Sequence, residues 1–274
     1  MTRHFELLAR LGYGARGVVY VALGLLALTT ALWGGALGQD SSDALNSILA
    51  LPFGRILLGG VALGLMAHIV WRLAQGLLNA DAVDNTPKGL VERLGRLVSA
   101  GANLFLALSA AALALGMGTG GDGNGEQTAS AWLIQQPFGP WLLVLVGVCV
   151  IGAGMAQIWK GISRSYQRRL DIPPSRAMLV DPVCRFGLFA RGAILAIVGG
   201  FLVYAGFAVS PEQAGGTAEA LSYVYSLPFG RILYGLVALG LIAFGAYSLV
   251  TAAYRRINPS AVASAGMAIR QAVT

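Results

Sequence analysis

Residues 52–66 read PFGRILLGGVALGLM, and closely similar text returns twice further along the chain. Residues 137–151 read PFGPWLLVLVGVCVI, and residues 228–242 read PFGRILYGLVALGLI. Each copy opens on Pro-Phe-Gly and continues as a long apolar run. A second apolar run precedes each copy and begins after an Arg-x-Gly, at residues 10–12, 93–95 and 185–187. One unit with two apolar runs is therefore used three times, which gives six runs.

The composition and the length of these runs indicate a membrane protein. Of the 274 residues, 56% are hydrophobic and only 11% are charged, whereas about 25% are charged in soluble domains. As a helix, the first run (Gly17 to Leu37) spans about 31 Å, which matches a bilayer core of about 30 Å. The runs lack a period of two and are longer than the ~9 to 11 residues of a barrel strand. We therefore expect an all-α membrane protein that forms a single domain over residues 1–274. The other five transmembrane helices are expected at 56–78, 97–118, 141–162, 189–209 and 232–254.

The basic residues are distributed unevenly between the two sides of such a bundle. The N-terminal arm, the linkers at 79–96 and 163–188 with the adjacent helix ends, and the C-terminal tail hold 17 of the 19 Lys and Arg residues. The remaining connections carry only Arg55 and Arg231. The positive-inside rule then predicts a multi-pass protein of the cell (inner) membrane with both termini in the cytoplasm. The high net charge of +7 favours attraction to anionic lipid headgroups on the cytoplasmic face, and the absence of aromatic interleaving argues against nucleic acid as a partner.

The repeat also predicts how the units are related. Each unit begins and ends on the inner side, so the three helix pairs are expected to be parallel repeats with pseudo-threefold symmetry. Their expected bounds are 10–80, 93–170 and 185–256. Apolar residues spaced by three or four at 44–48, 129–133 and 220–224 predict short amphipathic helices on the outer surface. The proline that follows is expected in the first turn of the next membrane helix.

These features are similar to those of a known family. Three tandem helix pairs, most with an Arg-Gly near the start of the first helix and Pro-Phe-Gly-Arg at the start of the second, resemble the bacterial membrane family catalogued as domain of unknown function 1206. The resemblance covers residues 10–256 and implies six membrane helices, but no activity. The middle unit departs from the pattern at Ser99 and Pro140.

Arg55 and Arg231 are candidate contacts for an anion or a partner on the outer face. They occupy corresponding positions of units one and three, and each lies at the N-terminus of a helix, where the dipole disfavours a cation. Two interpretations remain open. The side chains either reach the outer headgroups and pair with Asp43, Glu219 or a neighbour, or they bind external anions.

Arg16 and Arg191 are candidate contacts at the inner mouth of the bundle. Glycines follow them directly and again seven residues later, and small residues in one column let helices approach closely. The arginines then serve either as inner-leaflet anchors beside a packed interface or, if these helices face the central axis, as a ring around a cytoplasmic opening.

His68 is a candidate polar group within the membrane. It is either hydrogen-bonded to a neighbouring helix or part of a proton relay or pH-sensitive contact. Cys149 falls in the fourth helix and Cys184 in the linker before the fifth, so we expect two free thiols. The sequence contains no catalytic triad, metal-ligand cluster or phosphate-binding loop.

The sequence therefore predicts a non-enzymatic protein without metal or cofactor, acting as a compact scaffold through lipids or a membrane protein partner. The alternative is a permease or channel for a small solute or ion along the pseudo-threefold axis. Scarcity of polar groups at mid-membrane favours the first interpretation.

Overall fold

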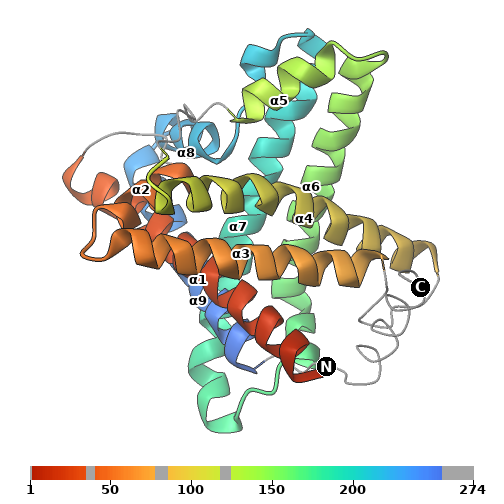
Figure 1. The fold of residues 1–274 in the computed structure, drawn as a ribbon. Helices are drawn as coiled ribbons and strands as arrows, with labels where there is room; N and C mark the ends of the chain where they lie inside the picture. Colours follow the sequence, from red (N-terminus) through yellow and green to blue (C-terminus); the bar gives the residue numbers. More distant parts are fainter. Residues whose placement is uncertain (1, 35–40, 78–85, 118–124, 255–274) are drawn as a thin grey trace.

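The described part of the chain is a bundle of six long helices joined by shorter ones (Figure 1). The computed structural model describes residues 2–34, 41–77, 86–117 and 125–254. Each long helix contains a segment long and apolar enough to cross a membrane, and no strand occurs among the described residues. The predicted all-α fold with six membrane-length helices is confirmed. The long helices are α1 (Thr2–Trp33), α3 (Gly54–Leu77), α4 (Pro87–Ala114), α6 (Gly139–Ser163), α7 (Pro174–Ala208) and α9 (Gly230–Tyr254).

Several helix boundaries differ from the sequence-based expectation: α1 begins at Thr2 rather than Gly17, and α4 begins at Pro87 rather than residue 97. Helix α1 ends at Trp33 rather than Leu37, because Gly34 adopts a left-handed φ of 81° of the kind that terminates helices; residues 35–40 lie outside the described residues. Helix α7 begins at Pro174, so it includes most of the stretch expected to be a linker. Proline at the first helical position explains this early start. Cys184 consequently lies within α7, where it is buried, and both cysteines are free thiols.

Short helices precede each Pro-Phe-Gly, as their apolar spacing predicts. They are α2 (Ser41–Leu49), α5 (Gly125–Ile134) and α8 (Thr217–Ser226), and two 3-10 turns, η1 (Ser165–Arg169) and η2 (Pro211–Gln213), complete the elements. In α2, Ala44 and Leu45 are fully buried, and Ala220 and Leu221 are fully buried in α8. Each of these two helices thus covers one end of the bundle with its apolar side.

The three Pro-Phe-Gly segments share one unusual backbone conformation. The φ angles of Phe53, Phe138 and Phe229 are 62°, 61° and 61°, in a region that non-glycine residues rarely occupy. The proline and phenylalanine are the two central residues of a tight turn, which requires a positive φ at its second central position. The expectation that the proline lies in the first helical turn is therefore wrong: each helix begins at the glycine. The rings are 79%, 80% and 81% exposed, so core packing does not explain the choice of phenylalanine.

The glycine of each segment is required by close backbone contact. A Cβ on Gly54 would lie 2.2 Å from the Leu49 carbonyl oxygen, and one on Gly230 would lie 1.8 Å from that of Tyr225. No side chain fits at such distances. The glycine thus lets the short helix and the long helix meet at a sharp corner.

The most extensive packing joins helices of neighbouring units. Helix α3 packs on α4, α6 on α7, and α9 on α1. In Figure 1 the α3–α4 pair runs across the view and the α6–α7 pair runs up it, so these two pairs cross. Glycine faces allow the close contact: a Cβ on Gly147 of α6 would lie 2.8 Å from the carbonyl oxygen of Gly199 on α7. The sequence repeat is therefore not the unit of packing.

Contacts within units link the three pairs into an arc. Helix α1 packs on α3 in the first unit and α7 packs on α9 in the third, whereas α4 and α6 of the middle unit make no comparable contact among the described residues. The long helices consequently follow one another in space as α4, α3, α1, α9, α7 and α6. The interior of the arc is filled by large side chains that are almost completely buried: Leu23, Leu58, Leu65, Leu188, Ile194, Tyr234, Leu241 and Phe244.

Candidate functional site

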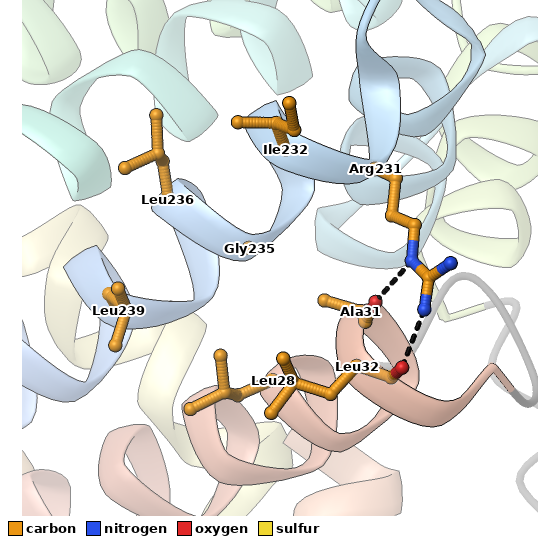
Figure 2. Close-up of a pocket in the computed structure, with 8 residues that line it drawn as sticks. All are labelled: Leu28, Ala31, Leu32, Arg231, Ile232, Gly235, Leu236 and Leu239. Carbon is orange, nitrogen blue, oxygen red and sulfur yellow. Dashed lines mark hydrogen bonds between the residues drawn. The ribbon is translucent and has the colours of Figure 1, made fainter.

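Arg231 caps the C-terminal end of the helix that lies antiparallel to its own (Figure 2). Its Nε donates a hydrogen bond of 2.6 Å to the carbonyl oxygen of Ala31, and its Nη2 donates to that of Leu32. The last carbonyls of a helix lack partners within the helix and carry its negative dipole. A cation at the start of α9 is therefore stabilised by the end of α1. The expected partner Glu219 instead accepts a hydrogen bond of 2.7 Å from the backbone N–H of Gly216.

Arg55 occupies the corresponding place in the first unit. Its guanidinium lies beside Gly116, just beyond the end of α4, where an added Cβ would be 3.3 Å from Nη2. Pro140 stands at this position of the middle unit. Arg55 and Arg231 thus both lie at the end of an antiparallel neighbour, an arrangement that accounts for cations at helix N-termini without a bound anion.

The arginines of the second and third Arg-x-Gly act in the same way at the opposite end of the bundle. Arg93 donates hydrogen bonds of 2.8 Å to the Gly76 carbonyl and 3.0 Å to the Leu77 carbonyl at the end of α3. Arg185 donates one of 3.1 Å to the Gly161 carbonyl near the end of α6. Sequence reasoning noted this motif without finding its role, although its recurrence before the first apolar run of every unit was a usable signal.

We expect Arg231→Gln to lower the free energy of unfolding by about 1 to 2 kcal/mol, because charge-assisted hydrogen bonds are worth about 1.5 to 3 kcal/mol and this side chain is partly exposed. Helix content followed during thermal unfolding in detergent measures the effect. Arg168→Gln, which removes an exposed arginine of η1, is the control. Equal stability of the Arg231→Gln protein and the wild type would contradict the capping role.

The glycine of Arg-x-Gly closes the contact between the two helices of a unit. A Cβ on Gly12 of α1 would lie 2.6 Å from the Cβ of His68 on α3, and one on Gly187 of α7 would lie 2.3 Å from the backbone nitrogen of Phe244 on α9. We call these contacts the closed seams. The corresponding glycine of the middle unit, Gly95, has nothing within 4 Å of such a Cβ.

A second pair of positions explains why the middle seam stays open. A Cβ on Gly64 would lie 2.5 Å from the Cβ of Ala15, and one on Gly240 would lie 2.1 Å from that of Ala190. The two closed seams therefore depend on a glycine facing an alanine.

The middle unit has Cys149 and Val98 at these two positions, and the extra bulk of a cysteine in place of glycine does not fit at that separation. Cys149 and Ala153 are exposed on α6. We call the faces of α4 and α6 that carry Gly95, Cys149 and Ala153 the open seam.

His68 lies in the first closed seam and is fully buried. Arg72, one turn along the same helix, donates a hydrogen bond of 3.3 Å from Nε to the His68 Nε2. The ring of Tyr13 on α1 meets the imidazole edge to face with 5.0 Å between centroids. The histidine is thus held by its own helix and by a ring of the neighbouring helix.

Arg16 and Arg191 come together inside the arc. The Arg16 Cζ lies 5.5 Å from the centroid of the Tyr20 ring and 5.0 Å from that of Phe244, and the Arg191 Cζ lies 4.9 Å from that of Tyr20. Helices α1 and α7, which carry these arginines, are separated in the arc by α9. The two predicted residues of the inner mouth therefore converge on one aromatic ring.

A polar cluster ties the connection after α6 to α7. The carboxylate of Asp181 accepts a hydrogen bond from the Tyr166 hydroxyl and one of 2.6 Å from Gln167 Nε2, and it lies 3.4 Å from Nε of Arg164. Burial, followed by the hydrogen bond to Asp181, raises the pKa of Tyr166. The tyrosine therefore stays protonated as a donor. Among the described residues, no three His, Cys, Asp or Glu side chains gather as metal ligands would.

An apolar groove of about 470 Å³ opens between α1 and α9 beside Arg231. Figure 2 shows its lining side chains, among them Leu28 from α1 and Leu236 and Leu239 from α9. Its shape and lining suit hydrocarbon, and it contains no polar group besides the capping arginine.

Comparison with known proteins places the chain in a family. The sequence profile of a family described as Domain of Unknown Function (DUF1206) matches residues 11–79, 94–164 and 186–255. The Uncharacterized protein YxxB of Bacillus subtilis (strain 168) is 32% identical over 252 residues, which cover 91% of this chain and 90% of that protein. No solved structure matches the chain. With three matches in tandem and a relative aligned over nearly its whole length, the chain belongs to the DUF1206 family.

Proposed function

We propose that this protein is a non-enzymatic scaffold of the membrane that holds a lipid or a membrane protein partner along the open seam. The observation that carries the proposal is the difference between three homologous seams. Two are closed by glycine and alanine, whereas the third presents the exposed residues Gly95, Cys149 and Ala153. Small residues on a membrane helix favour close approach of another helix or of an acyl chain.

The membrane and the orientation of this scaffold are proposed from the distribution of its basic residues. Six apolar helices indicate a multi-pass membrane protein. The basic residues gathered at the Arg-x-Gly end support a position in the inner membrane with both termini in the cytoplasm and with anionic headgroups on that side.

A permease is the second candidate, and the convergence of Arg16 and Arg191 inside the arc favours it. The large buried side chains that fill the interior argue against a path along the axis. Protein-dependent entry of an ion or solute into liposomes carrying the purified protein would favour the permease over the scaffold.

Photo-crosslinking tests the scaffold. With a benzophenone amino acid at Ala153, on the open seam, we expect one dominant adduct of a defined lipid or protein in native membranes. The same probe at Leu63, which is 75% exposed on α3 outside both the seam and the α1–α9 groove, should give only diffuse labelling of bulk lipid. Identical adducts at the two positions would show that the seam is ordinary lipid-facing surface.

A further inference from the structure

We propose that Arg16 and Arg191 bind the phosphate of an anionic lipid headgroup that reaches them through the open seam. This inference deepens the proposed scaffold function, since it assumes that the seam admits lipid. It adds a binding site inside the arc and the chemical class of its ligand.

The first argument is uncompensated charge. Ion pairs join Arg96 to Glu92 and Arg164 to Asp181, but within the described residues neither Arg16 nor Arg191 has a carboxylate partner. The Nε of Arg191 is buried without a hydrogen-bond acceptor. Partly desolvated cations are unfavourable unless paired, and contact with an aromatic ring recovers only about 0.5 to 2 kcal/mol. An anion bound by both arginines would therefore lower the free energy of this site.

The second argument is geometry. A guanidinium carries five N–H donors around its edge, so contact with an aromatic ring leaves several of them available. Two such edges near the Tyr20 ring, one from α1 and one from α7, suit the several oxygens of a phosphate, which arginine binds in bidentate fashion. Tyr20 is 9% exposed and holds both cations in place.

The third argument is depth. Arg16 lies about 22 Å along α1 from Ala31, the residue capped by Arg231, at a rise of ~1.5 Å per residue. In a bilayer core of about 30 Å, this places Arg16 about 8 Å inside the boundary of the opposite leaflet, so a phosphate that reaches it is drawn below the headgroup level. A lipid can thus bring its phosphate to the arginines while its chains remain in hydrocarbon.

The fourth argument is access. The position in the middle unit that corresponds to Arg16 and Arg191 is Ser99, on α4. This helix borders the open seam. The two arginines therefore belong to the units with closed seams. The helix beside the open seam carries an uncharged residue at the same position.

The test is lipid retention by the purified full chain, measured by native mass spectrometry with phosphatidylglycerol and with phosphatidylcholine. We expect the wild type to retain phosphatidylglycerol in preference. Arg16→Gln and Arg191→Gln should each weaken this retention by about tenfold or more, as expected for loss of a charge-assisted hydrogen bond. Arg168→Gln, at the same end of the bundle, should leave it unchanged. Equal weakening by all three changes, or none by the first two, would overturn the site.

Two further variants distinguish loss of the binding site from misfolding of the protein. Arg191→Lys keeps the positive charge without the paired N–H donors of the guanidinium, and it should weaken lipid retention less than Arg191→Gln. Tyr20→Phe keeps the ring and should retain the lipid. If both variants lose the lipid as fully as Arg191→Gln while keeping wild-type helix content, the proposed geometry is wrong.

A second arm separates the two sources of phosphate. Inorganic phosphate is titrated into the protein in neutral detergent without phospholipid, and we expect no saturable binding. Saturable binding that depends on Arg16 and Arg191 would assign the site to a free anion and overturn the lipid assignment. Crosslinking at Ala153 reports on the seam alone, so failure of this site is distinguishable from failure of the scaffold.

Discussion

Gly187→Ala is expected to destabilise the folded protein by about 2 kcal/mol or more, whereas Gly95→Ala is expected to stabilise it by up to about 1 kcal/mol. The two glycines hold the same position of different units. At Gly187 the new Cβ would meet the backbone nitrogen of Phe244 at 2.3 Å, and overpacking of this kind costs about 1 to 3 kcal/mol or more. At Gly95 the Cβ enters open space, so only the better helix propensity of alanine remains.

Unfolding in mixed detergent micelles, followed by circular dichroism, measures both changes. Gly12→Ala provides a repeat of the closed-seam result, since its Cβ would lie 2.7 Å from the Cα of His68. Destabilisation by Gly95→Ala similar to that by Gly187→Ala would show that the α4 and α6 faces are packed together.

Gly230→Ala has the other large expected effect. Its Cβ would lie 1.8 Å from the carbonyl oxygen of Tyr225, so the corner between α8 and α9 has to open. We expect a loss of about 3 kcal/mol or more in the free energy of unfolding, since backbone and not a flexible side chain has to move. The capping of α1 by Arg231 should be disturbed as well.

Gly235→Ala is the matched control for this change. It lies on the same helix, and its Cβ would be 3.6 Å from that of Ala31, an ordinary contact. Its unfolding midpoint should equal or exceed that of the wild type. Comparable losses for Gly230→Ala and Gly235→Ala in the same unfolding assay would refute the corner geometry.

The repeat and its apolar periods were enough to predict the elements of this fold. Three copies of Pro-Phe-Gly located the starts of α3, α6 and α9, and apolar spacing located the short helices before them, because both signals are local. The unusual φ of Phe53 and its two equivalents was not predictable, since phenylalanine has no preference for that region. The start of α7 at Pro174 was missed because its charged first turns resemble a linker.

The site was less accessible to sequence reasoning because it depends on contacts between units. Arg55 and Arg231 were singled out as cations at helix N-termini, but the helix ends that compensate them belong to other parts of the chain. The sequence does contain a signal for the open seam, since Cys149 and Val98 of the middle unit stand where the other units have a glycine and an alanine. Only knowledge of which helices face each other gives that replacement its meaning.

The pairing of α9 with α1 has a consequence for biosynthesis. Helix α1 is made before the other five long helices described and has its most extensive contact with α9, which is made after them, whereas α3 and α4, and then α6 and α7, meet soon after they are made. Gly17 and Gly24 lie on the face of α1 that contacts α9, so during insertion this face is exposed to lipid until α9 is in place. A nascent chain that stalls before Gly230 is left with that face uncovered, so this six-helix bundle is assembled only when α9 has entered the membrane.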